Sequence, residues 1–205
     1  DITRNNRMTV HLVDRDPDSR AILTHRLQAV GYQVRPFADL EPFLRVSRAL
    51  LPGCVVFHDL DDGEEARSFV GALRDQSQRL PLILVRELPD AAEAVNLMKL
   101  GVRDIIAPSA PAEVLEQAVA TAIAAMQSSA REDVASQSAR EKMQSLTERE
   151  HQILDRLSDG ATNKMIARDL GLSPRTVETY RVRILERLGV STLPEAIKLA
   201  AISSV

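Results

Sequence analysis

The stretch from Leu146 to Val190 reads LTEREHQILDRLSDGATNKMIARDLGLSPRTVETYRVRILERLGV, and it predicts three short helices joined by tight turns. The first helix has a clear beginning, because Thr147 is followed three residues later by Glu150, which is the spacing of a capping box. Apolar residues then recur at helical spacing until Gly160 ends the helix.

The second and third helices follow closely. Asn163 is expected to be the N-cap of the second helix, and Gly171 is expected to end it. Ser173 and Pro174 then provide an N-cap and a first-turn proline for the third helix. The short connection between these two helices is typical of a helix-turn-helix.

The third helix has two different faces. Large side chains at positions i, i+3, i+7 and i+11 form a stripe that we expect to be buried: Val177, Tyr180, Ile184 and Leu188. A helix fits the major groove of DNA and reads bases with residues near its N-terminal end. We therefore assign three residues on the other side of the helix as base readers: Glu178, Thr179 and Val182.

Cations in and around this helix are assigned to the DNA backbone. Phosphate contacts set the register of a protein on a duplex and give binding its salt dependence. The residues with this expected role are Lys164, Arg175, Arg183 and Arg187. The alternative for any one arginine is an ordinary solvated surface position.

Three runs of this stretch resemble the LuxR-type helix-turn-helix: residues 146–150, 160–167 and 172–178. Tyr180 and Arg187 stand where a histidine and a lysine are common in that family, and both keep the physical role, a buried ring and a cation. The resemblance implies a bacterial transcription regulator that binds double-stranded DNA as a homodimer.

Composition indicates a two-domain cytoplasmic protein. The chain has 205 residues, enough for two domains, and its single cysteine, Cys54, cannot form an intrachain disulfide. We expect a reducing compartment, no secretory signal and no membrane-spanning segment. Residues 1–7 are polar and are expected to form a disordered leader.

The charge is uneven along the chain. Residues 1–126 contain 14 basic and 18 acidic residues, whereas residues 146–205 contain nine and eight. The predicted DNA-binding module is therefore barely basic. Its affinity must depend on locally placed arginines and on the pairing of two copies, rather than on a broad positive field.

Residues 8–126 alternate short apolar runs with amphipathic segments. The apolar runs predict strands at residues 10–13, 32–35, 54–57, 82–85 and 104–106. Because helices separate these strands, the pattern predicts an α/β domain with a doubly wound, five-stranded parallel sheet. Functional groups in such folds gather at the carboxyl ends of the strands. The first helix is expected to point four apolar residues inward: Ile22, Leu23, Leu27 and Val30.

This half resembles the flavodoxin-like receiver domain of two-component response regulators, through residues 13–17, 59–60 and 100–106. With the LuxR-type module behind it, the chain is similar to the NarL/FixJ class. Receivers of that class take a phosphoryl group on an aspartate at the end of the third strand, beside Mg²⁺ held by neighbouring acids. Asp59 matches that aspartate, and Asp14 matches the first acid.

Other positions of this site depart from the resemblance. Arg15 stands where the Mg²⁺-binding second acid is usual, Arg86 where a switch hydroxyl is usual, and Pro108 where a lysine is usual. Asp16 is the remaining acid of the pocket. A divalent cation prefers several oxygen ligands, and an arginine repels it, so Mg²⁺ binding is not expected. We expect a degenerate receiver in which both arginines approach Asp59 in a fixed ion pair.

Three functions remain open for this receiver. The favoured one is a phosphorylation-independent module for dimerisation or partner docking in a DNA-binding regulator. The second is conventional phosphorylation of Asp59 by a sensor histidine kinase. The third is a sensor whose altered pocket binds a metabolite or a protein and controls release of DNA. RNA binding is disfavoured, because the C-terminal helices carry no stacking aromatic ring beyond Tyr180.

Two segments complete the domain plan. Residues 127–145 lack proline and glycine, and they suit either a continuing linker helix or a flexible tether. Residues 146–205 form the small all-α module. By resemblance its last helix pairs two modules, and packing on its own module is the alternative. The chain shows no metal-ligand spacing, phosphate-binding loop or nucleophile motif, so we expect no catalytic residue, metal or cofactor.

Overall fold

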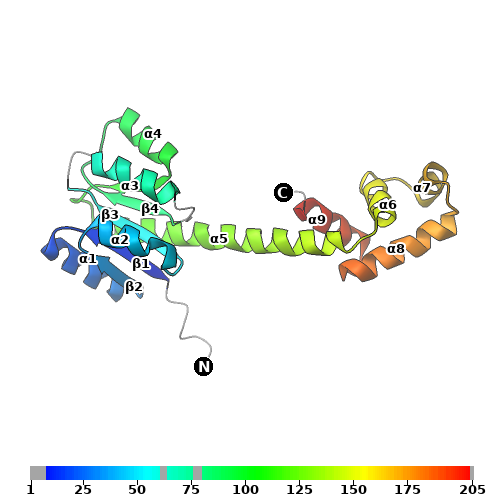
Figure 1. The fold of residues 1–205 in the computed structure, drawn as a ribbon, viewed down its shortest axis with the longest axis horizontal. Coiled ribbons are helices and arrows are strands. Elements are labelled where there is room, and N and C mark those ends of the chain that lie inside the picture. Colours follow the sequence, from blue (N-terminus) through cyan, green and yellow to red (C-terminus); the bar gives the residue numbers. More distant parts are fainter. Residues whose placement is uncertain (1–7, 61–63, 76–79, 204–205) are drawn as a thin grey trace, which may run out of the picture. The chain divides into compact units, whose positions relative to one another are not determined.

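The computed structural model describes residues 8–60, 64–75 and 80–203, and the chain divides into two compact parts, residues 1–128 and 129–205 (Figure 1). The leader expected at residues 1–7 lies outside the described residues. Each part has a hydrophobic core of its own. Among the helices described, none is both long enough and apolar enough to cross a membrane.

The first part is built on a parallel five-stranded sheet with the strand order β2-β1-β3-β4-β5. Its strands are β1 (Thr9–Asp14), β2 (Gln33–Phe37), β3 (Gly53–His58), β4 (Leu82–Val85) and β5 (Val102–Ile106). The predicted α/β fold is confirmed. Strands β1, β3 and β4 are almost wholly buried on both faces, which explains why they read as continuous apolar runs rather than alternating ones.

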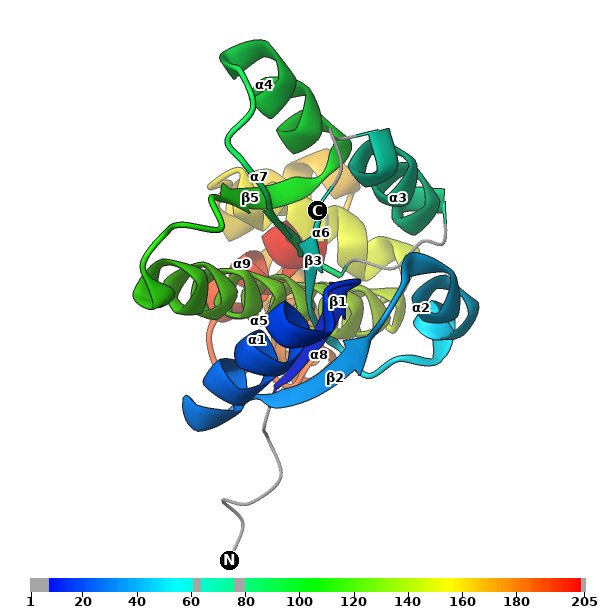
Figure 2. The same cartoon turned by 90° about the vertical axis from the view of Figure 1, so that its left-hand side faces the viewer.

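Helices cover both faces of this sheet (Figure 2). They are α1 (Pro17–Ala29), α2 (Leu40–Val46), α3 (Glu64–Asp75), α4 (Ala91–Leu100) and α5 (Ala112–Gln144), with a 3-10 turn η1 (Ser47–Ala49) after α2. Leu27 of α1 and Val119 of α5 lie in the core on one face, and Phe43 of α2, Phe69 of α3 and Leu97 of α4 lie in the core on the other. The sheet is therefore doubly wound, as predicted.

Helix α1 buries a narrower stripe than its apolar spacing predicts. Leu23 and Leu27, one turn apart, are buried as expected, but Ile22 is 58% exposed and Val30 is 49% exposed. Ile22 precedes Leu23 by one residue, about 100° around the helix, so the two side chains cannot both face the sheet. Val30 is the C-cap residue and lies beyond the last helical turn. The prediction of a wider stripe is wrong at these two positions.

The second part is helical. It contains α6 (Glu148–Ser158), α7 (Asn163–Leu170), α8 (Pro174–Leu188) and α9 (Leu193–Ser203). The predicted caps are present at α6, where Thr147 and Glu150 form a capping box, and at α8, where the Ser173 side chain accepts the amide of Thr176. Helix α7 differs by one residue, because its N-cap is Thr162. Asn163 is therefore the first residue of the helix, and its side chain is not used for capping.

The core of this part lies between α6, α7, α8 and α9. The predicted stripe of α8 is buried at Val177, Ile184 and Leu188, whereas Tyr180 is only partly buried. Helix α9 contributes the buried Ala196 to this same core, so it packs on its own module.

Helix α5 runs without a break from Ala112 to Gln144, so residues 127–144 are helical. Its last turns belong to the second part. Ala139 is 2% exposed, and Met143 packs against the second core. The Arg140 Nε atom donates to the carbonyl oxygen of Ser203 at 3.3 Å, which ties these turns to the end of α9.

Candidate functional site

The first acid of the receiver pocket, Asp14, is fully buried and already has partners for both carboxylate oxygens. Its Oδ1 accepts the backbone amide of Asp16 at 3.0 Å, and its Oδ2 lies 3.0 Å from His58 Nδ1. Ser19 Oγ lies 3.1 Å from the same ring nitrogen. Burial alone would raise the pKa of Asp14, but the hydrogen bonds from His58, Ser19 and Asp16 outweigh burial and lower it. An ionised Asp14 therefore accepts the Nδ1 hydrogen of His58.

The sequence did not predict the pairing of His58 with Asp14. It considers His58 beside Asp59, its chain neighbour, and neighbouring strand residues point to opposite faces. In the parallel register of β1 and β3, however, Asp14 lies directly opposite His58. Aligning the carboxyl ends of these two strands would have revealed the pair.

Asp16 and Arg15 do not point toward a shared metal site. The carboxylate of Asp16 caps α1, accepting the amides of Asp18 at 2.9 Å and Ser19 at 3.4 Å. Arg15 Nη2 lies 3.2 Å from Asp39 Oδ1, and both side chains are nearly half exposed. The expectation that Arg15 approaches Asp59 is therefore wrong, because the extended chain after β2 offers it the carboxylate of Asp39 instead.

Arg86 lies where the sequence predicts it, against Asp59. Its Nη1 atom is 3.3 Å from Asp59 Oδ2, with Asp59 4% and Arg86 8% exposed. The same nitrogen is 3.5 Å from Glu93 Oε1 of α4, and Glu93 also pairs with Arg67 of α3 at 3.0 Å. The sequence missed these last two residues, because no local pattern brings α3 and α4 to the end of β4.

This arrangement does not fit a divalent cation. One acid position holds Arg15, both oxygens of Asp14 accept hydrogen bonds, and the guanidinium of Arg86 covers Asp59. Pro108, exposed in the turn after β5, supplies no cation. Across the part of the chain that the structure describes, no cluster of three or more acidic, histidine or cysteine side chains could hold a metal.

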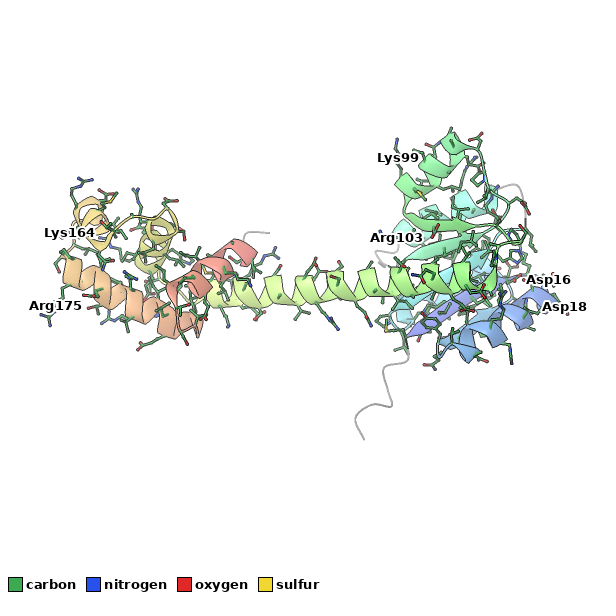
Figure 3. All side chains as sticks on the ribbon, turned by 180° about the vertical axis from the view of Figure 1, so that it is seen from behind. Asp16, Asp18, Lys99, Arg103, Lys164 and Arg175 are labelled. Carbon is green, nitrogen blue, oxygen red and sulfur yellow. The ribbon has the colours of Figure 1, made fainter. Side chains whose placement is uncertain are left out.

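In the second part, the residues assigned to DNA lie mainly on the exposed surface of α7 and α8. The exposed ones are Lys164, Arg175, Glu178, Thr179, Val182, Arg183 and Arg187. Figure 3 shows Lys164 on α7 and Arg175 in the first turn of α8. Val182 is 53% exposed, which is unusual for a large apolar side chain and suits contact with a base. The guanidinium of Arg183 lies 6.0 Å from the ring centre of Tyr180.

Other arginines of this part hold its helices together. Arg187, which we assigned to a phosphate, donates from Nη1 to the Ser145 carbonyl at 2.8 Å, and its Nε lies 3.3 Å from Glu150. Arg181 Nη1 donates to Asn163 Oδ1 at 3.0 Å. Sequence reasoning missed both structural roles, because each contact joins residues far apart in the chain.

Glu150 is the buried acid of this network, with an exposure of 2%. Burial alone would raise its pKa. The amide and hydroxyl of Thr147, both 2.8 Å from Glu150 Oε2, lower it further than burial raises it, with help from the charges of Arg187 and Arg183. Glu150 therefore supports the capping box as an ionised carboxylate.

Comparison with known proteins agrees with both parts. The model of the family "Bacterial regulatory proteins, luxR family" matches residues 144–200. The transcriptional regulatory protein FixJ of Rhizobium meliloti is 30% identical over 196 residues, covering 94% of each chain. The chain belongs to the NarL/FixJ family of response regulators. It is a DNA-binding transcription regulator of that family.

Further relatives extend over nearly the whole chain. The transcriptional regulatory protein TdiR of Thauera aromatica is 30% identical and covers 91% of this chain and 82% of its own. Among solved structures, StyR is similar with a TM-score of 0.75 at 27% identity, covering 95% of this chain and 98% of its own. Full-length FixJ from B. japonicum has a TM-score of 0.61 at 28% identity, covering 96% and 97%.

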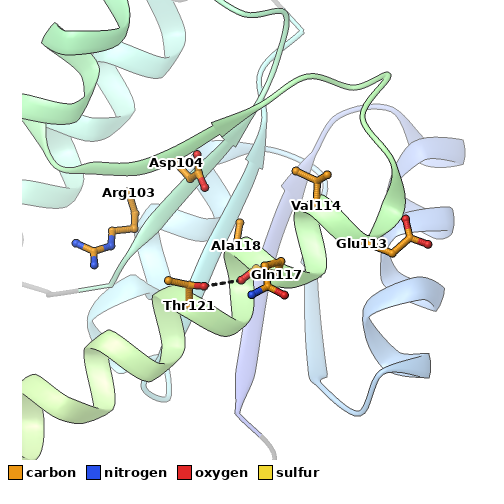
Figure 4. Close-up of a pocket in the computed structure, with 7 residues that line it drawn as sticks. All are labelled: Arg103, Asp104, Glu113, Val114, Gln117, Ala118 and Thr121. Carbon is orange, nitrogen blue, oxygen red and sulfur yellow. Dashed lines mark hydrogen bonds between the residues drawn. The ribbon is translucent and has the colours of Figure 1, made fainter.

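One surface hollow of this response regulator lies away from both sites. It has a volume of about 410 Å³ and lies between β5 and the first turns of α5 (Figure 4). Arg103 and Asp104 come from β5, and Thr121 of α5 donates to the Gln117 carbonyl at 2.9 Å. None of the residues assigned to phosphorylation or to DNA lines this hollow.

Proposed function

We propose that this response regulator binds its DNA sites without phosphorylation of its receiver, which serves as a dimerisation or partner-docking module. The buried contact between Arg86 and Asp59 carries the proposal. Its arginine occupies the position where the resemblance implies a switch hydroxyl. A side chain that already covers the acceptor carboxylate leaves little room for an incoming phosphoryl group.

The electrostatics of phosphoryl transfer support the same conclusion. Transfer depends on cations placed where negative charge develops, normally Mg²⁺ and a lysine. Here Arg15 replaces a metal-binding acid, and Pro108 replaces the lysine. Arg86 is positive, but it is held between Asp59 and Glu93 and would have to leave one of them to follow a phosphate.

For the DNA complex we propose that α8 enters the major groove, with Glu178, Thr179 and Val182 reading bases. Lys164, Arg175 and Arg183 contact phosphates, and Arg187 adds a phosphate contact from the exposed part of its side chain. A single small module makes few base contacts, so two copies of the chain bind two half-sites.

The second candidate is a conventional regulator phosphorylated on Asp59 by a sensor histidine kinase. Asp59 stands at the end of β3, and the chain is similar over almost its whole length to FixJ proteins. These observations favour it, whereas the contacts of Asp14, Arg15 and Arg86 favour the first candidate.

Intact mass spectrometry separates the two candidates. The full chain is incubated with Mg²⁺ and acetyl phosphate beside Asp59→Ala, with a conventional receiver as positive control. We expect no added phosphoryl group on this chain while the control is modified. Addition of one phosphoryl group to the wild type, and none to Asp59→Ala, would establish the conventional switch.

A further inference from the structure

Helix α7 is held at both ends by arginines from other helices. At its first residue, the carboxamide oxygen of Asn163 accepts a hydrogen bond from Arg181 Nη1 of α8 at 3.0 Å. At its last residue, the carbonyl oxygen of Leu170 accepts a hydrogen bond from Arg149 Nη2 of α6. The first of these contacts joins the two helices that carry the proposed DNA contacts.

The local sequence frees Asn163 for this contact. Thr162 is the N-cap of α7, and its hydroxyl accepts the amide of Met165 at 3.4 Å. Asn163 is therefore inside the first turn and directly precedes Lys164, one of the proposed phosphate contacts. A hydrogen bond that holds Asn163 also limits where Lys164 can lie.

Arg181 differs from the arginines assigned to phosphates. Its side chain is partly buried, whereas Arg175 and Arg183 are exposed. It directly precedes Val182 in α8, so the helix that presents the proposed base readers is the same helix that carries this tie. Its charge makes the hydrogen bond to the amide stronger than one between two neutral groups.

We propose that Arg181 is a positioning residue for sequence-specific DNA binding. It holds the start of α7 on α8, so that phosphate contacts from α7 and base contacts from α8 form on the same duplex in one register. The inference rests on the DNA contacts proposed above. Arg181 acts through Asn163 and does not itself neutralise a phosphate.

The test is a double-mutant cycle in the full-length protein. A duplex selected from a random library by the wild type is the specific probe, and a scrambled duplex of equal length is the non-specific probe. Affinities are measured over a range of salt concentrations for Arg181→Met, Asn163→Ala and the double variant. Arg168→Met removes the same charge from an exposed position of α7 and is the matched control.

Each single variant is expected to weaken binding to the selected duplex by about fivefold, with the double variant no weaker than the singles. Binding to the scrambled duplex and the salt dependence should stay unchanged, as for the control. A purely structural defect would lower the fraction of active protein and weaken both duplexes equally, so it would leave their ratio unchanged and contradict the inference. Asn163→Ala serves where Arg181→Met fails to fold.

Two results would overturn the inference. One is a loss with Arg181→Met alone, accompanied by a salt dependence shallower by about one ion, because that is the behaviour of a direct phosphate contact. The other is an unchanged affinity in all three variants. Arg175→Met tests the proposed contacts separately: if it is neutral while Asn163 and Arg181 remain coupled, the contact assignment fails and the positioning role stands.

Discussion

Asp59 and Arg86 are each more than nine-tenths buried, so removal of either charge strands the other. Asp59→Ala is expected to destabilise the receiver by about 1–3 kcal/mol, because Arg86 would keep only Glu93 as a close carboxylate. Chemical denaturation of the full chain measures the loss. The double variant Asp59→Leu with Arg86→Met removes both charges and should recover most of it. Unchanged stability and dimer content in Asp59→Ala would argue against a fixed ion pair.

Glu150 makes the second part sensitive to acid. Its pKa in the folded protein lies below the ordinary value of 4.5, so its ionised form stabilises the fold above that pH. The contribution is lost as the pH falls through the folded pKa. Glu150→Gln should therefore melt at a lower temperature than the wild type near neutral pH, and the difference should shrink below about pH 4.5. A difference that is independent of pH would show that the Glu150 charge is not responsible.

At the residue scale, the sequence predicts positions better than partners. It predicts Arg86 against Asp59, because the carboxyl ends of adjacent parallel strands meet at one edge of the sheet. It fails for Arg15, since a long side chain on an exposed loop has several acids within reach. It also misses Arg181, whose partner Asn163 depends on how two helices pack rather than on local spacing.

At the scale of the elements, the last turns of α5 are part of the DNA-binding module. The burial of Ala139 and the hydrogen bond from Arg140 to Ser203 predict that a fragment beginning at residue 146 is less stable than one beginning at residue 129. A loss of about 1 kcal/mol would lower the melting temperature of so small a domain by about 4–8 °C. Equal melting temperatures would mean that these turns contribute nothing to the module.

The sequence predicts most helix ends, because caps are local chemistry. The capping box of Thr147 and Glu150 and the cap at Ser173 are present as predicted. The start of α7 differs by one residue, since Thr162 and Asn163 are both good N-caps and nothing local decides between them. The apolar stripe of α1 is overpredicted for a similar reason: spacing marks a helical face, but only packing decides how wide a face the sheet covers.

For the whole molecule, the small number of outward cations limits the salt dependence of DNA binding. Three exposed cations per copy, Lys164, Arg175 and Arg183, give six phosphate contacts in a dimer, so log Kd should change with log salt with a slope of magnitude about 5. Arg175→Met removes one contact from each copy and should reduce that slope by about two. Titrations of a two-half-site duplex at several salt concentrations measure both. A slope of about ten would require other cations, with the internally bonded arginines first among them.

The covered carboxylate of Asp59 also has a consequence for regulation in the cell. On the proposed function, neither a foreign kinase nor a pool of small phosphodonors can alter this regulator, so it is insulated from cross-talk. Promoter occupancy then follows the amount of protein present, set by its synthesis and degradation. Control of its own gene would be control of its whole response.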